Sequence, residues 1–167
     1  MIKYSVLCLR NKDPHKIIAK AIRDIEGLSW NHVEILRHDT ETGEKRTFGA
    51  KYPESRTITL DELLEHYEIE FQIPLVVKVS IEECDKKLYS LMGKKYSQLQ
   101  FLLISFSLLW KSWLPFVKPN LTNELICTEV IGEFLIDCCK IALPKSQEML
   151  TLRDIWSICV TANIQQE

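Results

Sequence analysis

The 167-residue sequence predicts an α+β fold in which helices pack on an antiparallel sheet. Apolar and polar residues alternate in segments such as His32–Leu36 and Phe71–Val79, the pattern of a strand with one buried face. Apolar residues recur at helical spacing between Ile17 and Ile25. A polar stretch with a glycine, Thr40–Glu44, follows the first of these strands, which predicts a hairpin and therefore antiparallel pairing.

The N-terminal residues predict one strand and one helix. Tyr4–Leu9 is a short apolar run rich in strand-forming residues. Asp13 and Pro14 have the residue types favoured at the N-cap and at the first helical position, so we expect the helix to begin there. Gly27 is expected to end it.

The next strand opens with His32. Its alternation places Val33 and Ile35 on one face of the sheet, and His32, Glu34 and Leu36 on the other. The histidine and the glutamate are therefore expected to share a face.

The hairpin partner of this strand is expected over Lys45–Ala50, and Tyr52–Ser55 is expected to break it. Thr59 begins a capping pattern, which predicts a short helix. Ile69–Val79 is the next strand region, where Pro74 indicates an edge position or a bulge.

Beyond the strand region Ile69–Val79, two helices are expected besides a short helix or turn at Thr151–Trp156 and the apolar stretch described below. One begins at Ser80, runs to Leu91 or Met92 and is stopped by Gly93, and the other runs from about Asn123 to Lys140. The apolar face of the second carries Cys127, Val130, Ile131, Phe134, Leu135 and Cys138. The other face is expected to carry Thr128, Glu129, Glu133 and Asp137.

The most apolar stretch lies between Tyr96 and Val117. Its length approaches that of a membrane span, but Lys111 and Pro115 interrupt it. We interpret it as a core helix followed by an apolar loop, with membrane or lipid contact through Leu99–Val117 as the alternative.

Composition narrows the classes of function. The net charge of −2 and the isoelectric point near 6.1 argue against non-specific binding of nucleic acid, which needs a basic face. The six cysteines show no C-x-x-C pair, and no histidine cluster lies beside them, so we expect neither a metal nor a cofactor. Met1–Leu7 does not resemble a secretion signal. We therefore expect one cytoplasmic domain over residues 1–167.

Cys127 is a candidate nucleophile because it lies at the expected start of a helix. Free backbone N–H groups and the helix dipole stabilise a thiolate there. The alternative is that Cys127 is a small buried apolar residue, as Cys8, Cys84, Cys138 and Cys159 are expected to be. Position alone does not decide between these interpretations.

His32 is the candidate base. A histidine that opens a strand can also be a solvated or a core residue, so this candidate too is ambiguous alone. His15 lies in a first helical turn, His38 beside the hairpin turn and His66 at a helix end, and each is a weaker candidate.

The chain resembles the circularly permuted branch of the NlpC-type papain-like superfamily, which includes bacterial and phage hydrolase-like proteins and, more distantly, relatives of lecithin:retinol acyltransferase. Three segments carry the resemblance, in the order that the permuted branch has them across about residues 4–160. They are Ser29–Ile35 with its histidine, Gly93–Ser97 with the Gly-x-x-Tyr pattern, and Ile126–Val130 with Cys-Thr-Glu.

The resemblance implies a papain-like fold, with a partly barrel-like antiparallel sheet and the nucleophile-bearing helix packed across it. It implies that Cys127 is the nucleophile, that His32 is the general base, and that Tyr96 packs beside the site. The residue that orients the histidine should lie on the following strand, but Thr47–Ala50 offers no suitable side chain. Glu34 is the substitute that we predict, although it could instead be a strand carboxylate paired with a neighbouring Lys or Arg.

We therefore expect a thiol hydrolase of the peptidase or amidase kind, which cleaves an amide or ester bond through a thioester. Its substrate would be a peptide, another amide or an acyl lipid. Two alternatives stay open. One is a non-catalytic binding or interaction module on the same scaffold, and the other is a lipid acyltransferase at a membrane surface.

Overall fold

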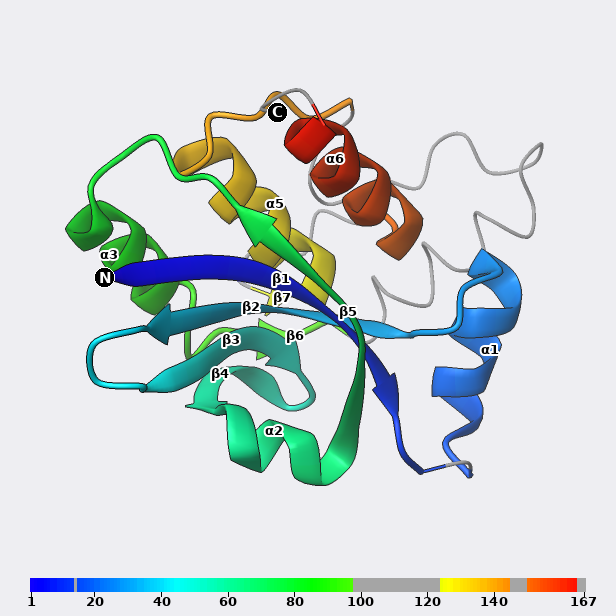
Figure 1. The fold of residues 1–167 in the computed structure, drawn as a ribbon. Coiled ribbons are helices and arrows are strands. Elements are labelled where there is room, and N and C mark those ends of the chain that lie inside the picture. Colours follow the sequence, from blue (N-terminus) through cyan, green and yellow to red (C-terminus); the bar gives the residue numbers. More distant parts are fainter. Residues whose placement is uncertain (14, 98–123, 145–149, 165–167) are drawn as a thin grey trace.

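The computed structural model describes residues 1–13, 15–97, 124–144 and 150–164 (Figure 1). It confirms the α+β class, with one mostly antiparallel sheet and helices packed on it. The strands are β1 (Ile2–Asn11), β2 (His32–Asp39), β3 (Lys45–Lys51), β4 (Glu54–Thr59), β5 (Tyr67–Leu75), β6 (Lys95–Tyr96) and β7 (Glu124–Leu125). The helices in these ranges are α1 (Ile17–Glu26), α2 (Leu60–His66), α3 (Ile81–Ser90), α5 (Cys127–Asp137) and α6 (Leu152–Ile164).

The strands follow the order β5-β1-β2-β3-β4-β6-β7 across the sheet. All neighbouring strands are antiparallel except β6 and β7, which are parallel. The β2–β3 hairpin forms as predicted. Strand β5 is an edge strand, as Pro74 indicated, and its register against β1 shifts between Cys8 and Leu9.

Alternation along β1 and β2 directs apolar side chains to both faces of the sheet. Val6 and Val33 belong to the larger core, under α3, α5 and α6. Leu7 and Leu36 belong to a smaller cluster with Leu63 of α2. Figure 1 shows α5 and α6 on one side of the strands and α2 on the other. Helix α5 contacts β2 and β3, so it packs across the strand that begins at His32.

The start of α1 was predicted too early. The helix begins at Ile17 with Lys16 as its N-cap, whereas the Asp13 carboxylate accepts a hydrogen bond from the His15 N–H at 2.9 Å. Asp13 therefore caps a turn that precedes the helix, and Pro14 lies outside the described residues. The predicted end is confirmed, because Gly27 adopts the left-handed conformation with φ 63°.

The capping patterns located two helices correctly. Thr59 caps α2 and Ser80 caps α3, each in a reciprocal arrangement with the glutamate three residues later. Gly93, with φ 77°, follows the end of α3. Strand β4 was not predicted. The break expected over Tyr52–Ser55 is only a short turn, and a new strand begins at Glu54.

Helix α5 begins four residues later than predicted. The short strand β7 precedes it, so Cys127 is its first residue. Thr128 and Glu129, which were expected on the outer face, are buried. The Glu129 carboxylate accepts the Ile126 N–H at 2.7 Å, which explains why a carboxylate is buried in the first turn. Helix α6 is longer than the predicted terminal turn.

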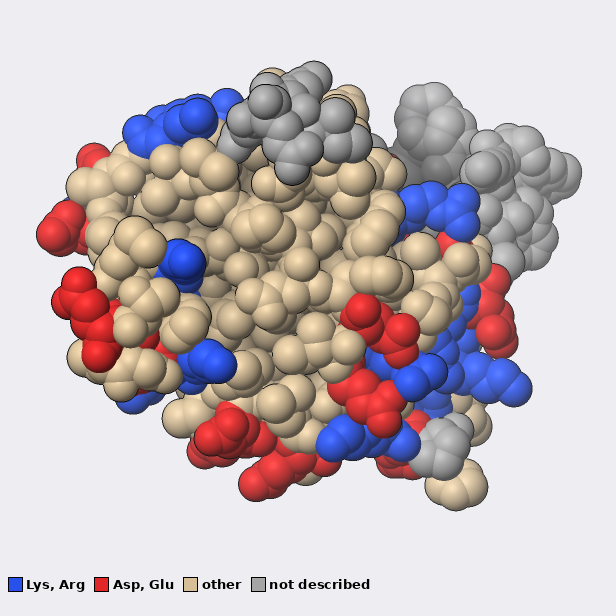
Figure 2. All heavy atoms as spheres, viewed as in Figure 1, with Lys and Arg blue, Asp and Glu red and all other residues tan. Residues whose placement is uncertain are grey.

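The interpretation of the apolar Leu99–Val117 stretch concerns residues outside the described part of the chain. In the ranges that are described, no helix combines the length and apolar character needed to cross a bilayer. The face in Figure 2 has an uncharged centre, with Lys, Arg, Asp and Glu interleaved around it. This face therefore carries no continuous basic surface.

Candidate active site

Strand β2 places His32 and Glu34 on the same face, as the alternation predicted. His32 Nε2 lies 3.0 Å from Glu34 Oε1, so the two side chains share a hydrogen bond. The histidine is 6% exposed and the glutamate 1% exposed. Because the pair is buried, water does little to weaken the attraction between a charged imidazole and the carboxylate.

Gly49 on β3 provides the space for the Glu34 side chain. The β2–β3 register pairs Ile35 with Phe48, and its continuation by one residue brings Glu34 opposite Gly49. A Cβ atom at position 49 would lie 2.4 Å from Glu34 Cγ and 2.7 Å from Cδ. No side chain larger than hydrogen fits there unless the glutamate moves.

Cys127 lies at the N-terminus of α5 and is 2% exposed. Its thiol lies close enough to the His32 ring to contribute to the raised pKa of that histidine. The first N–H groups of a helix have no carbonyl partner within it, so they and the helix dipole favour negative charge at this position. The structure thus brings together Cys127, His32 and Glu34, three residues that the sequence singled out.

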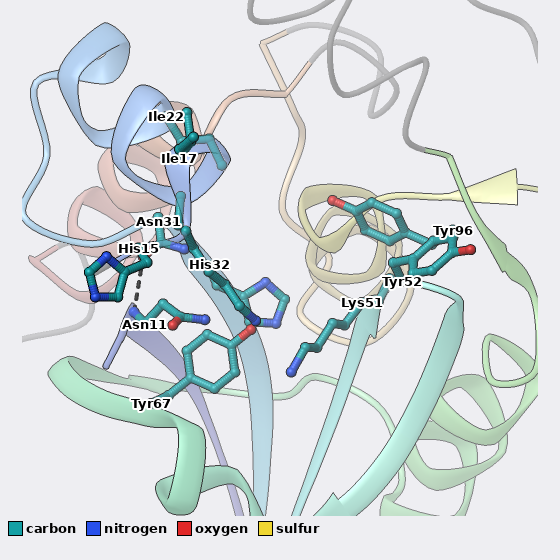
Figure 3. A pocket seen from close by; sticks show the side chains of 13 residues that line it. Asn11, His15, Ile17, Ile22, Asn31, His32, Lys51, Tyr52, Tyr67 and Tyr96 are labelled. Carbon is teal, nitrogen blue, oxygen red and sulfur yellow. Dashed lines mark hydrogen bonds between the residues drawn. The ribbon is translucent and has the colours of Figure 1, made fainter. Parts of the chain in front are cut away.

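Tyr67 is a further member of this cluster, and no local sequence pattern pointed to it. It follows the last residue of α2 and opens β5, and its ring stacks on His32 with 5.3 Å between ring centres. Lys51 of β3 places its Nζ atom 5.0 Å from the centre of the Tyr67 ring. Figure 3 shows the His32 and Tyr67 rings side by side, with the Lys51 side chain extending toward them.

The surroundings of His32 favour its protonated form. Burial of the ring lowers the pKa of His32, but the interactions with Tyr67, Cys127 and Glu34 raise it by more. The net result is a pKa well above the ordinary value of 6.5. A histidine with this preference holds a proton well when a neighbouring thiol gives one up.

Tyr96, predicted beside the site from the Gly-x-x-Tyr segment, is half-buried at the end of β6. Burial raises the pKa of Tyr96, and the charges of Cys127, Tyr67 and Glu129 raise it further. Its phenol is therefore held in the neutral form.

The other five cysteines are buried free thiols. Burial raises the pKa of Cys8, Cys138, Cys139 and Cys159 to about 12, and it raises the pKa of Cys84 as well. These thiols stay protonated at neutral pH. Cys127 is the cysteine that the structure places against His32.

A cavity of about 540 Å³ reaches this cluster. Its walls include His32, Tyr67 and Tyr96, with Ile17 and Ile22 contributed by α1 (Figure 3). His15 also borders the cavity, whereas His38 lies near the far end of β2 and His66 ends α2. Within the described ranges, no three His, Cys, Asp or Glu side chains are grouped to hold a metal ion.

A scan against protein-family models and a search of curated protein sequences each found no match. The resemblance to the permuted NlpC-type branch therefore stays a prediction from the sequence motifs.

Proposed function

We propose that this protein is a cysteine hydrolase with a permuted papain-like fold, which cleaves an amide or ester bond through a thioester on Cys127. One observation carries the proposal. A thiol at a helix N-terminus lies beside a buried histidine and raises its pKa, and that histidine shares a hydrogen bond with a buried carboxylate. This is the arrangement that an activated nucleophile, a general base and an orienting residue require.

In the first half of the reaction, His32 takes the Cys127 proton and the thiolate attacks the carbonyl carbon of the substrate. A C–S bond forms, and the bond to the leaving nitrogen or oxygen then breaks. His32 gives its proton to that leaving group, which departs as an amine or an alcohol. In the second half, His32 deprotonates a water molecule that attacks the thioester, and the acid product and the Cys127 thiol are released.

The negative charge on the carbonyl oxygen would be stabilised by backbone N–H groups at the start of α5, including that of Cys127. The α5 helix supports this role because it begins at Cys127, after an extended N-cap residue, Ile126. Tyr96 would border the substrate, since it lines the same cavity as His32.

Glu34 would orient the imidazole and stabilise its protonated form. The resemblance implies an orienting residue on the strand after the histidine, where this chain has Gly49. A carboxylate from β2 occupies the space over that glycine and makes the hydrogen bond to His32. In the proposed hydrolase, Glu34 over Gly49 would take the place of the orienting residue that the resemblance implies on β3.

The proposal is tested by alkylation with iodoacetamide at neutral pH, followed by mass spectrometry of each cysteine-containing peptide. We expect Cys127 to react fastest, and His32→Ala to slow it by about 100-fold, within the range that general acid–base partners contribute. His38→Ala is the matched control, because His38 lies on the same strand outside the site. Alkylation of Cys127 that is equally fast in folded His32→Ala protein would contradict the proposal.

A binding module without turnover is the second candidate. It is favoured by the burial of both reactive side chains, of which Cys127 is 2% exposed and His32 6% exposed. In this case the three residues form a buried polar network, and Cys127 reacts no faster than the other five cysteines. The alkylation experiment therefore separates the two candidates.

A further inference from the structure

The cavity beside His32 has the size and character of a site for a small organic group. Its 540 Å³ falls within the roughly 300–1,000 Å³ of typical ligand pockets. Much of its wall is apolar or aromatic, with Ile17, Ile22, Tyr52, Tyr67 and Tyr96 among its lining residues. Ile17 and Tyr52 are exposed at 82% and 65%, so apolar surface remains accessible around the cavity. These walls favour an apolar side chain or ring.

The charges around the cavity have one sign. Lys16 and Lys51 line it, and no described lining residue is an aspartate or a glutamate. In the described ranges neither lysine forms an ion pair with a carboxylate. Glu34, the nearby acid on β2, is already bound to His32. The cavity therefore offers ammonium groups to a ligand that brings its own negative charge.

Lys51 is the better placed of the two ammonium groups. Its Nζ lies over the ring of Tyr67, and that ring stacks on His32. Lys51 and His32 also line the same cavity. Lys16 is exposed, so water screens its charge more strongly.

The position of the cavity indicates which half of the substrate it receives. Its lining includes His32, which would protonate the leaving group, whereas Cys127, which would retain the acyl group, is not among the described lining residues. A leaving amine or alcohol must lie against the imidazole at the moment of proton transfer. The cavity is thus on the leaving-group side of the scissile bond.

We propose that this cavity binds the leaving-group half of the substrate, and that this half combines an apolar or aromatic group with a carboxylate recognised by Lys51. The proposal rests on the hydrolase function above. The bond cleaved would then join an acyl group to an amine or alcohol that carries a carboxylate, as in an acylated apolar amino acid. Lys51 would determine specificity for the carboxylate.

Binding of 3-phenylpropionate and of 3-phenylpropionamide tests this, because they differ in charge but not in the phenyl group. Titration calorimetry with the full chain is expected to give about tenfold tighter binding of the carboxylate, the factor of one charge-assisted hydrogen bond. Lys51→Met should remove that preference, because the positive charge is lost, and Lys51→Arg should retain it, because the charge is kept. Both variants keep an aliphatic stem beside Tyr67, so they differ mainly in charge. Lys45→Met is the matched control, because Lys45 lies at the other end of β3.

Equal affinity for the two compounds, binding of neither, or a carboxylate preference that persists in Lys51→Met would each overturn the proposal. Circular dichroism of each variant checks that it is folded. The alkylation experiment gives an independent result for the hydrolase function. If Cys127 reactivity depends on His32 but the carboxylate is not preferred, the hydrolase stands and the specificity proposal fails. If the carboxylate is preferred but reactivity ignores His32, the hydrolase proposal has failed instead.

Discussion

Helix α5 carries a buried cysteine at each end, and the two have opposite surroundings. Cys127 is its first residue, is 2% exposed, and lies beside His32, whose pKa it helps to raise. Cys138 is its C-cap, 1% exposed, and lies against Cys84, with a pKa raised to about 12. Burial is therefore the same for both thiols. The two thiols differ in the end of the helix that they occupy and in the side chain beside them, which is His32 for Cys127 and Cys84 for Cys138.

The largest expected difference between the two cysteines is in turnover. Cys127→Ala should reduce hydrolysis of p-nitrophenyl acetate to the rate without enzyme, because the nucleophile is lost. Cys138→Ala should retain the wild-type rate, at a cost of about 1 kcal/mol in the free energy of unfolding. Steady-state kinetics and urea denaturation measure the two effects. Equal loss of activity in both variants would break the comparison.

Gly49→Ala tests whether Glu34 needs the space over β3. The added Cβ would lie 2.4 Å from Glu34 Cγ, so we expect about 1–3 kcal/mol less free energy of unfolding, the usual cost of overpacking. The displaced carboxylate should also slow alkylation of Cys127.

Glu34→Ala in the Gly49→Ala background provides the control for this clash. Without the glutamate side chain, Gly49→Ala should lower the free energy of unfolding much less than it does in the wild-type protein. A double-mutant cycle by urea denaturation measures this difference. Additive effects would show that Glu34 and Gly49 do not share this space.

A smaller effect is expected in the pH dependence of stability. The folded protein raises the pKa of His32 above 6.5, so its contribution to stability is full below pH 6.5 and is lost as the pH rises through the folded-state pKa. The raised pKa of Cys138 has an effect of the same sign at higher pH. Its contribution to stability is lost as the pH rises from about 9 toward 12.

Urea denaturation across pH 6 to 10 separates the contribution of His32 from that of Cys138, because the ordinary pKa is about 6.5 for histidine and about 8.5 for a thiol. The loss that begins near neutral pH should disappear in His32→Ala but persist in Cys138→Ala. An unchanged profile in His32→Ala would mean that the histidine does not hold its proton in the folded protein.

Local patterns in the sequence predicted those parts of the site that depend on a single element. The period of β2 placed His32 and Glu34 on one face, and the capping patterns located α2 and α3. The start of α5 was displaced by four residues, because the two-residue strand β7 has no detectable period. The burial of Glu129 was also missed. Its carboxylate accepts a hydrogen bond from a backbone N–H, where a glutamate on an exposed helix face would be solvated by water.

Contacts between distant elements could not be predicted from the sequence. Tyr67 stacks on His32 only because β5 pairs with β1 and β1 with β2. In the sequence, Gly49 had no role beyond its place in a predicted strand. Its role is to leave space for the Glu34 side chain, and this depends on the β2–β3 register and on the direction of that side chain. Both contacts follow from sheet topology, which no short motif encodes.

The most direct test of the central claim is detection of the thioester itself. The protein is mixed with p-nitrophenyl acetate, quenched in acid within the first turnovers, and digested for peptide mass spectrometry. The hydrolase proposal predicts one acetyl group on Cys127, absent in His32→Ala and absent at Cys138. Acetylation spread evenly over the six cysteines, or none at Cys127 while the ester is consumed, would contradict it.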